Sequence, residues 1–315
     1  MPVAQDDFSI IWYGAHALVS GGNPYAAVGP GRAFPWGYPL LYPLPGILVG
    51  VPLVPFGPRI AAAIFAGLGA ALLWFGVVRS GKPYLLLVLA SAPFIYAVGI
   101  SQWSPLLVGA ALVPAFGFLL VAKPTIGAAL FLYRPSWRAA IGAVFFIVLA
   151  FVIDPGWLGA WREALRGSGA HMPSPIAHGA GPLLALAVLR WRRPEARLLL
   201  VMACIPQTPI LYETLPLALI PASLTEMVIF VALSWAAYAW WYVAGISVHV
   251  GGMHLPLAAQ IPISLRIIVP LLYLPCLVMV LHRSNEGALP AWMEMRLARW
   301  RGRFGQHRAT RSTTA

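Results

Sequence analysis

The sequence predicts an all-helical protein that crosses a membrane several times. Three observations carry this prediction. Hydrophobic residues make up 60% of the 315-residue chain and charged residues only 10%, whereas a soluble domain has roughly 25% charged residues. Apolar runs such as 60–78, 137–153, 227–243 and 265–281 approach the about 20 residues that cross a bilayer as a helix. The runs are continuous rather than alternating, which excludes a transmembrane β-barrel.

The apolar runs predict one transmembrane domain over residues 1–282, with about eleven spans (ten to twelve). Several predicted spans are shorter than a full crossing, and prolines such as Pro105, Pro124 and Pro216 interrupt them. Interrupted helices are tolerated at membrane depth where they line an enclosed or wet cavity. The predicted spans are 38–56, 58–78, 84–99, 101–113, 117–133, 137–154, 180–191, 196–206, 212–224, 226–245 and 263–282.

Three segments are too polar or too broken to span a membrane: residues 1–37, 155–179 and 246–262. The first contains an amphipathic stretch at 8–19, and the second contains another at 157–167. Under the eleven-span count all three segments lie on the outer face, where they are expected to form short interfacial helices.

The net charge of +12 comes from basic residues that cluster between the apolar runs. Examples are Arg134 and Arg138, the loop 190–197 and the tail 283–315. Lys and Arg are retained on the cytoplasmic side of membrane proteins, so the tail is expected to be cytoplasmic. The charge is explained by topology in a cell (plasma) membrane and by attraction to anionic membrane lipids, and no nucleic-acid partner is expected.

Two residues disagree with this topology. Arg79 and Lys82 fall on the outer face in the eleven-span count, against the rule that places basic residues inside. If 101–113 and 117–133 form a single crossing, the N-terminus becomes cytoplasmic instead.

Few chemical motifs are present. Cys204 and Cys276 lie inside apolar runs and are expected to pack there, without the ligand spacing of a zinc site. No Walker, Rossmann, GxSxG or HExxH motif occurs, which argues against ATP hydrolysis and dinucleotide chemistry. No cofactor is expected, and a metal requirement is left open.

The nine acidic residues are few enough to consider one by one. Asp6 and Asp7 precede the amphipathic stretch 8–19, and they either cap that helix or supply a general base at the membrane surface. Glu213 lies between two short apolar segments, where an ionisable group is a functional candidate. The others sit beside arginines or at predicted helix ends: Asp154, Glu163, Glu195, Glu226, Glu286 and Glu294.

Several cations are further candidates. Lys123 is flanked by apolar residues and followed by Pro124, so it either extends to the membrane interface or holds a phosphate. His171 and His178 lie in a predicted outer loop, where a lone histidine is more often incidental.

The order of several short motifs resembles a known family. The stretch DFSIIWYGAHALVSGGNPY (7–25) is followed by Tyr38-Pro39, by Gln102 in GISQWSPLL and by Lys123-Pro124. In this order they resemble glycosyltransferase family 87, the polyprenyl-phosphate-sugar-dependent, mannosyltransferase-like integral-membrane group. The turn residues that match are Gly22, Pro24 and Tyr25.

The chain also departs from that family. Ser101 stands where Gly is usual, and Tyr212 and Glu213 stand where the family tends to carry His. A first span precedes the family's Asp, but only six residues precede Asp7. Either the start codon lies further upstream or this chain has lost that helix, and restoring it gives twelve spans with both ends cytoplasmic.

The resemblance implies a GT-C fold and an inverting hexosyltransferase, with mannose the expected sugar. The donor would be a polyprenyl-phosphate sugar and the acceptor a lipid or glycan, with the active site on the extracytoplasmic side. Asp7 would be the general base. The resemblance and the basic outer loop together suggest these donor-binding residues: Gln102, Lys123, Arg162, Arg166, His171 and His178. The substrate pocket would include Asp6, Tyr25, Tyr38, Tyr212 and Glu213.

Three other functions stay open on the sequence alone. A transporter or flippase of a lipid-linked sugar shares proline-broken helices and buried ions but needs no essential base. A polysaccharide polymerase or ligase shares the lipid-phosphate donor. An inactive family member or structural membrane subunit is the third.

Overall fold

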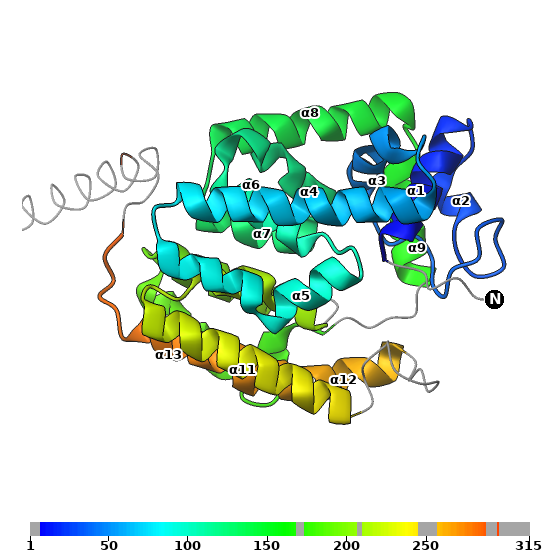
Figure 1. Ribbon diagram of the computed structural model, residues 1–315. Coiled ribbons are helices and arrows are strands. Elements are labelled where there is room, and N and C mark those ends of the chain that lie inside the picture. Colours follow the sequence, from blue (N-terminus) through cyan, green and yellow to red (C-terminus); the bar gives the residue numbers. More distant parts are fainter. Residues whose placement is uncertain (1–6, 168–172, 207–209, 245–256, 288–294, 296–315) are drawn as a thin grey trace, which may run out of the picture.

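The computed structural model describes residues 7–167, 173–206, 210–244, 257–287 and 295. Asp6, His171 and most of the tail predicted at 283–315 lie outside these ranges. Within them the secondary structure is helical, apart from one isolated bridge between Val28 and Phe34. The prediction of an all-helical chain is therefore confirmed for this part of the protein (Figure 1).

The elements occur in the following order (Figure 1). They are α1 (Asp7–Val19), α2 (Pro24–Ala27), α3 (Leu44–Gly50), η1 (Val51–Leu53), α4 (Pro58–Arg79), η2 (Pro83–Ala90), α5 (Ala92–Gly99), α6 (Ser104–Leu112), η3 (Pro114–Ala122), α7 (Pro124–Tyr133), α8 (Trp137–Ile153), α9 (Trp157–Gly167), η4 (Pro175–Ala177), η5 (Gly181–Arg190), α10 (Pro194–Cys204), η6 (Leu211–Leu219), α11 (Leu224–Val243), α12 (Leu257–Ile268), η7 (Val269–Tyr273) and α13 (Leu274–Leu281).

Three helical stretches in the described residues are long and apolar enough to cross a membrane: Pro58–Arg79, Leu224–Val243 and Pro262–Leu281. Two bent pairs raise the number to at most five, namely α5 with α6, which meet at 119°, and α8 with α9, which meet at 96°. These spans are consistent with a polytopic membrane protein. The predicted count of about eleven is not confirmed.

Proline explains part of the difference. The predicted span 117–133 breaks at Lys123 into η3 and α7, and the predicted span 84–99 breaks at Ser91 into η2 and α5. Pro124 and Pro93 sit at the start of the second piece of each pair. Proline lacks a backbone N–H and disfavours helical geometry in the residue before it. Each piece has eight to ten residues, about half of what a crossing needs.

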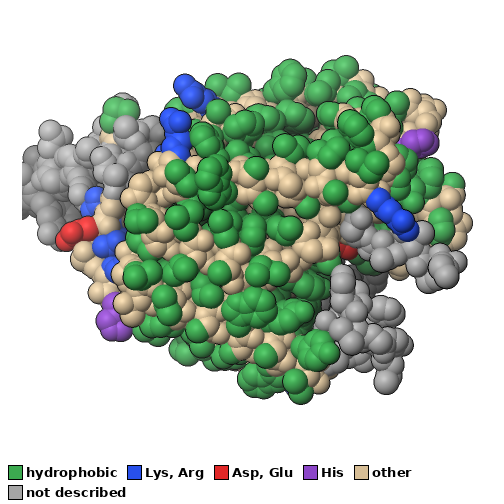
Figure 2. Space-filling model, in the orientation of Figure 1, with side chains coloured by type: hydrophobic (Ala, Val, Ile, Leu, Met, Phe, Trp, Pro, Cys, Tyr) green, Lys and Arg blue, Asp and Glu red, His purple; other side chains and the backbone are tan. Residues whose placement is uncertain are grey.

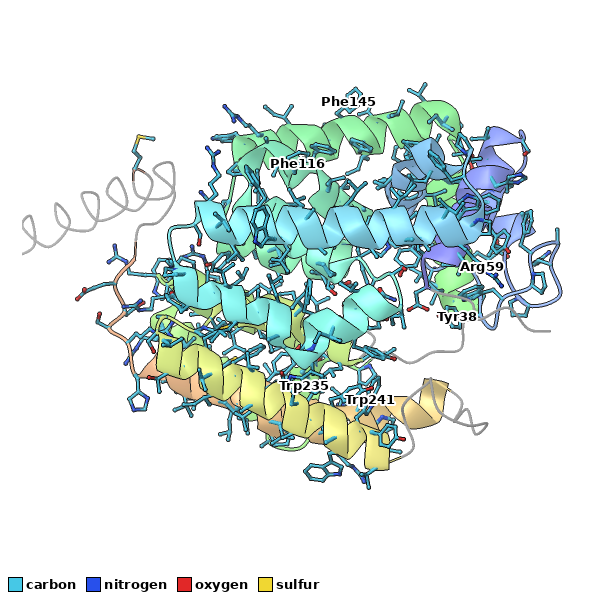
Figure 3. All side chains as sticks on the ribbon, in the orientation of Figure 1. Tyr38, Arg59, Phe116, Phe145, Trp235 and Trp241 are labelled. Carbon is cyan, nitrogen blue, oxygen red and sulfur yellow. The ribbon has the colours of Figure 1, made fainter. Side chains whose placement is uncertain are left out.

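The outer surface of α8 is apolar. Ile141 and Val152 are 67% and 73% exposed, and Phe145 and Phe116 also point outward. Figure 3 labels both phenylalanines on the side of the molecule that α8 covers, and Figure 2 shows hydrophobic side chains over most of the visible face. A soluble monomer rarely exposes an apolar area this continuous, which agrees with a lipid environment.

The backbones of α4 and α6 approach closely because both helices carry glycine at the contact. A Cβ atom at Gly109 would lie 2.6 Å from the backbone nitrogen of Leu73, and one at Gly69 would lie 3.2 Å from that of Leu106. Small residues at helix contacts in membrane proteins allow this approach. Gly69 and Gly109 therefore hold α4 and α6 together as a tightly packed pair.

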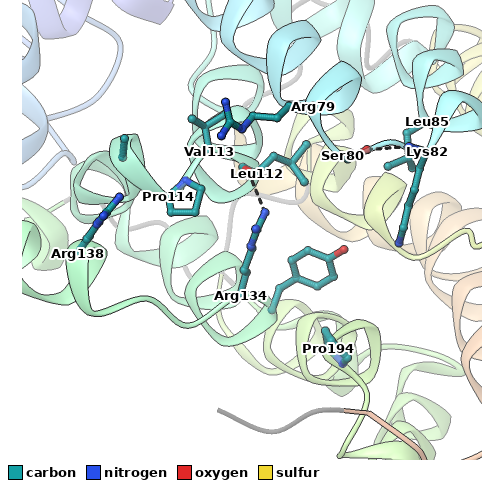
Figure 4. A pocket seen from close by; sticks show the side chains of 12 residues that line it. Arg79, Ser80, Lys82, Leu85, Leu112, Val113, Pro114, Arg134, Arg138 and Pro194 are labelled. Carbon is teal, nitrogen blue, oxygen red and sulfur yellow. Dashed lines mark hydrogen bonds between the residues drawn. The ribbon is translucent and has the colours of Figure 1, made fainter. Parts of the chain in front are cut away.

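Both ends of α4 carry an exposed arginine, Arg59 at the start and Arg79 at the end, but further cations gather around Arg79. Arg79 and Lys82, at and just after the end of α4, line one cavity together with Arg134 and Arg138 (Figure 4). The four cations thus share one end of the molecule, which we call the basic end. The eleven-span count, which placed Arg79 and Lys82 on the opposite face from Arg134 and Arg138, is wrong on this point. A change of one in the number of crossings between Lys82 and Arg134 is enough to bring the two pairs of cations to the same face.

Candidate functional site

Asp7, the first residue of α1, is fixed by two contacts to the turn between α5 and α6. Its backbone N–H donates to the carbonyl oxygen of Ile100 at 3.1 Å. Its carboxylate oxygen Oδ2 accepts a hydrogen bond from the side-chain amide Nε2 of Gln102, 95 residues away in the sequence. The carboxylate therefore contacts a distant segment, which the helix-cap interpretation did not predict.

The turn that carries Gln102 has an unusual backbone. Ser101 has φ +56°, and it is the only non-glycine residue with positive φ in the described ranges. Such a conformation is uncommon for a residue with a side chain, and strained residues gather at functional sites. The Gln102 N–H donates to the carbonyl of Ala97 at 2.8 Å, and the side chain is 2% exposed. The turn thus holds the Gln102 amide against Asp7.

Lys123 and Glu213 form a second pair. Lys123 Nζ lies 2.5 Å from Glu213 Oε1, and the side chains are 13% and 2% exposed. The ammonium also lies over two aromatic rings, 5.2 Å from the centroid of Tyr212 and 5.8 Å from that of Tyr42. Such a cation–π arrangement is favourable when it is shielded from water. Lys123 therefore points to an internal partner, and of the two interpretations that the sequence left open, extension to the interface is not observed.

Tyr42 and Tyr212 connect the two pairs. Each interacts electrostatically with both Asp7 and Glu213, so these rings lie near both carboxylates. Tyr212 stacks on Tyr96 with ring centroids 6.1 Å apart. We call the group formed by Asp7, Gln102, Lys123 and Glu213 and these two rings, Tyr42 and Tyr212, the central site.

The position of the central site along α4 follows from the aromatic residues next to Asp7 and Gln102. Phe8, next to Asp7, stacks on Phe65 of α4 with ring centroids 4.3 Å apart, and Phe65 meets Trp103 edge-on at 5.0 Å. Phe65 is seven residues from the start of α4. At 1.5 Å per residue this is about 10 Å along a helix about 33 Å long. The site thus lies nearer the Pro58 end of α4 than the basic end.

Two predicted pocket residues, Tyr38 and Tyr25, lie before α3. Burial, and second the negative charge of Asp7, raise the pKa of Tyr38 above its usual value of 10.0. Burial, and second the charge of Asp154, do the same to the pKa of Tyr25. The Tyr25 hydroxyl donates to the carbonyl of Tyr42 at 3.1 Å. Tyr38 is thus close to the central site, whereas Tyr25 supports the backbone that positions Tyr42.

The predicted phosphate-binding cations of the second outer loop are placed differently. Arg162 and Arg166 are exposed on α9, an amphipathic helix as predicted, which packs on α2 and α3. The indole N–H of Trp161 anchors α9 by donating to the carbonyl of Leu41 at 2.9 Å. His178 follows η4, which packs on η5 and α10. None of the three belongs to the Asp7–Gln102 or the Lys123–Glu213 pair.

Sequence reasoning missed Tyr42 and Tyr96. The segment YPLLYP contains two Tyr-Pro pairs four residues apart, and the family resemblance drew attention to Tyr38 rather than to Tyr42. The repeat itself was a usable signal. Tyr96 carried no comparable signal, because it lies in an ordinary apolar stretch.

The structure also bears on metal sites and cysteines. In the described ranges, no group of three or more His, Cys, Asp or Glu residues could hold a metal ion. Cys276 is buried as predicted, but Cys204 is exposed. It ends α10 and faces outward, although its apolar neighbours predicted packing.

No family model, curated protein or solved structure matches this chain. The resemblance to glycosyltransferase family 87 therefore stays a hypothesis, and function has to be argued from the geometry of the central site.

Proposed function

We propose that this protein is an inverting glycosyltransferase that transfers a hexose from a polyprenyl-phosphate donor to a hydroxyl of a lipid or glycan acceptor. The observation that carries the proposal is the Asp7–Gln102 contact. A carboxylate at the start of α1 is held by a buried amide, and the buried Lys123 belongs to the same site. A base and a cation near each other, set back from one end of an apolar bundle, suit a donor whose tail lies in lipid.

Asp7 has the chemistry of a general base. Its carboxylate would take the proton from the acceptor hydroxyl while the hydroxyl oxygen attacks the anomeric carbon. The bond between that carbon and the phosphate oxygen breaks, and the lipid phosphate leaves with the electron pair. Gln102 donates an N–H to one carboxylate oxygen, which fixes the orientation of the carboxylate.

Lys123 is the candidate for stabilising the departing phosphate. An ammonium offers three N–H donors, and charge developing on a leaving group is stabilised by preorganised donors. Glu213 already offsets the charge of Lys123 at 2.5 Å. A bound phosphate would therefore compete with Glu213 for the ammonium, and Glu213 would tune how strongly Lys123 holds the donor.

The charge distribution supports an extracytoplasmic site in the cell membrane. Arg79, Lys82, Arg134 and Arg138 gather around one cavity at the basic end, whereas Arg59 is the arginine at the start of α4. The side with the excess of Lys and Arg faces the cytoplasm. The central site lies toward the other end of α4, which then faces the outer leaflet.

The test is transfer of radiolabelled sugar from a panel of polyprenyl-phosphate sugars in membranes that contain the full chain. Asp7→Asn should lower transfer by about 10²- to 10⁴-fold, as expected for loss of a general base. Asp154→Asn is the matched control, because it makes the same chemical change after α8, outside the central site. It should keep the wild-type rate. Wild-type transfer by correctly inserted Asp7→Asn would refute the proposal.

Transport of a lipid-linked sugar is the second candidate. The 119° bend between α5 and α6 and the buried Lys123–Glu213 pair favour it, because broken helices and buried ions line substrate paths in transporters. Translocation of a labelled lipid-linked sugar in vesicles without formation of any new glycosidic bond would support transport over transfer.

A further inference from the structure

A cavity of about 660 Å³ lies at the basic end, far from the central site (Figure 4). Four separate segments supply its cations: Arg79 at the end of α4, Lys82 before η2, Arg134 after α7 and Arg138 at the start of α8. Its volume is within the range of small-molecule sites, about 300–1,000 Å³.

The lining is cationic without a compensating acid. None of the residues that line the cavity is Asp or Glu. The neighbouring Glu195 does not line it, and it interacts electrostatically with Arg197 and with Tyr133, a residue of the lining. Arg134 is held in place by a hydrogen bond from its Nη1 to the carbonyl oxygen of Leu112, 2.8 Å long. A fixed guanidinium with three further cations around a common space is suited to a phosphate.

Apart from Ser80 and Tyr133, the rest of the cavity lining is apolar. Leu112, Val113 and Pro114 form part of the wall. Outside it, Trp74 and Trp137 are 53% and 72% exposed, and tryptophan is enriched at the level of lipid headgroups. A ligand in this cavity can thus place an anionic group among the cations while an apolar part lies against α4 and α8.

We infer that the basic-end cavity binds the phosphate headgroup of an anionic membrane phospholipid. The inference does not depend on the proposed transferase activity, because it rests on other residues at the other end of the bundle. The shared chemistry is a phosphate, which an anionic phospholipid or soluble phosphate could supply. The apolar wall and the exposed tryptophans favour the lipid.

The test uses the full chain purified in detergent and titrated with fluorescent phosphatidylglycerol or phosphatidylcholine. We expect saturable binding of phosphatidylglycerol and at least tenfold weaker binding of phosphatidylcholine. The double variant Arg79→Gln/Arg138→Gln should weaken phosphatidylglycerol binding by about 25-fold, since each cation near a lipid headgroup contributes about a fivefold change. The matched control Arg32→Gln/Arg59→Gln removes two exposed charges elsewhere and should stay within twofold of wild type.

Other outcomes would overturn the inference. Equal loss in both double variants would show a net-charge effect rather than a site, and equal binding of the two lipids would show no phosphate recognition. Displacement of the lipid by about 1 mM inorganic phosphate would identify soluble phosphate as the ligand.

A second measurement does not depend on folding of the variants. A phosphatidylglycerol with a photoreactive headgroup should crosslink the wild-type chain at peptides that line the cavity. Crosslinks confined to peptides of α1 or α11 would contradict the site.

Discussion

The central site and the basic end both bring together charged residues from several helical segments, but the charges are buried at the first and exposed at the second. At the central site, Lys123 and Glu213 are paired, 13% and 2% exposed, and Asp7 is bonded to Gln102. At the basic end, Arg79, Lys82, Arg134 and Arg138 are exposed around a cavity that no acid lines. Burial requires pairing because an isolated charge inside a protein is very costly, whereas exposed cations keep their water.

This difference indicates how each site would select its ligand. The central site is preorganised by contacts within the chain, so it can hold a substrate in one geometry. The basic end keeps charge available, so its ligand has to bring the opposite charge. Measurements of stability and pH dependence can test this contrast, and their expected effects decrease from the buried pair to a single tyrosine.

The largest effect is expected at the Lys123–Glu213 pair. Lys123→Met leaves the Glu213 carboxylate buried without its partner, and we expect the free energy of unfolding to fall by about 3–5 kcal/mol. The double variant Lys123→Met/Glu213→Met removes both charges and should recover most of that loss. Thermal unfolding of the purified protein in detergent measures both. A double variant as unstable as Lys123→Met would show that the pair matters for packing rather than for charge.

A smaller effect is expected for a second, more exposed ion pair outside the central site. The Arg283 guanidinium contacts Glu226, and the side chains are 12% and 27% exposed. Because water partly screens the pair, Glu226→Gln should cost about 1 kcal/mol. The same unfolding assay applies, with Glu213→Gln measured alongside. If the two substitutions cost the same, the contrast between the ends is not one of burial.

A smaller effect of opposite sign is expected at Ser101. Its φ of +56° costs a residue with a side chain roughly 1–2 kcal/mol. Glycine avoids this cost, but its greater conformational freedom in the unfolded state lowers the stability of the folded state by about 0.5–1 kcal/mol. Ser101→Gly should therefore stabilise the protein by about 0.5 kcal/mol, and Ser101→Val should destabilise it. Thermal denaturation gives the sign of the change in the free energy of unfolding. The comparison assumes that the contact between Gln102 and Asp7 is the same in the variants. A destabilising glycine would show that the Ser101 side chain is needed at the turn.

The smallest effect is a pH dependence that arises at Tyr38. Because burial and the Asp7 charge hold its pKa above 10.0 in the folded state, the unfolded tyrosine ionises first as pH rises. The stabilising contribution is thus complete below pH 10 and is lost progressively above it. Unfolding midpoints at pH 8 and pH 10.5 should differ less in Tyr38→Phe than in wild type. If wild type and Tyr38→Phe show the same pH dependence of stability, then that dependence arises from a residue other than Tyr38.

Some of this structure could be predicted from the sequence. Composition predicted the helical membrane class, and amphipathic spacing located the helices at 8–19 and 157–167, which appear as α1 and α9. The motif order drew attention to Asp7, Gln102 and Lys123, and the first two meet directly.

Other features could not be predicted, for a physical reason. Apolar residues flank Lys123 and Ser91 on both sides, so composition does not show whether the helix continues through these positions or breaks there. Partners such as Glu213, 90 residues from Lys123, depend on how the segments on either side of that break pack. Spacing along one helix reports only which residues share a face, and it cannot find a partner on another segment.

The glycine contacts between α4 and α6 have a mechanical consequence. With Gly69 and Gly109 pressed against the facing backbone, neither helix can slide or rotate past the other, and the two behave as one rigid bar. Arg79 lies at one end of this bar and the Gln102 turn lies toward the other. A change in the tilt of α4 at Arg79 would therefore be carried along α6 toward the turn whose Gln102 amide contacts Asp7.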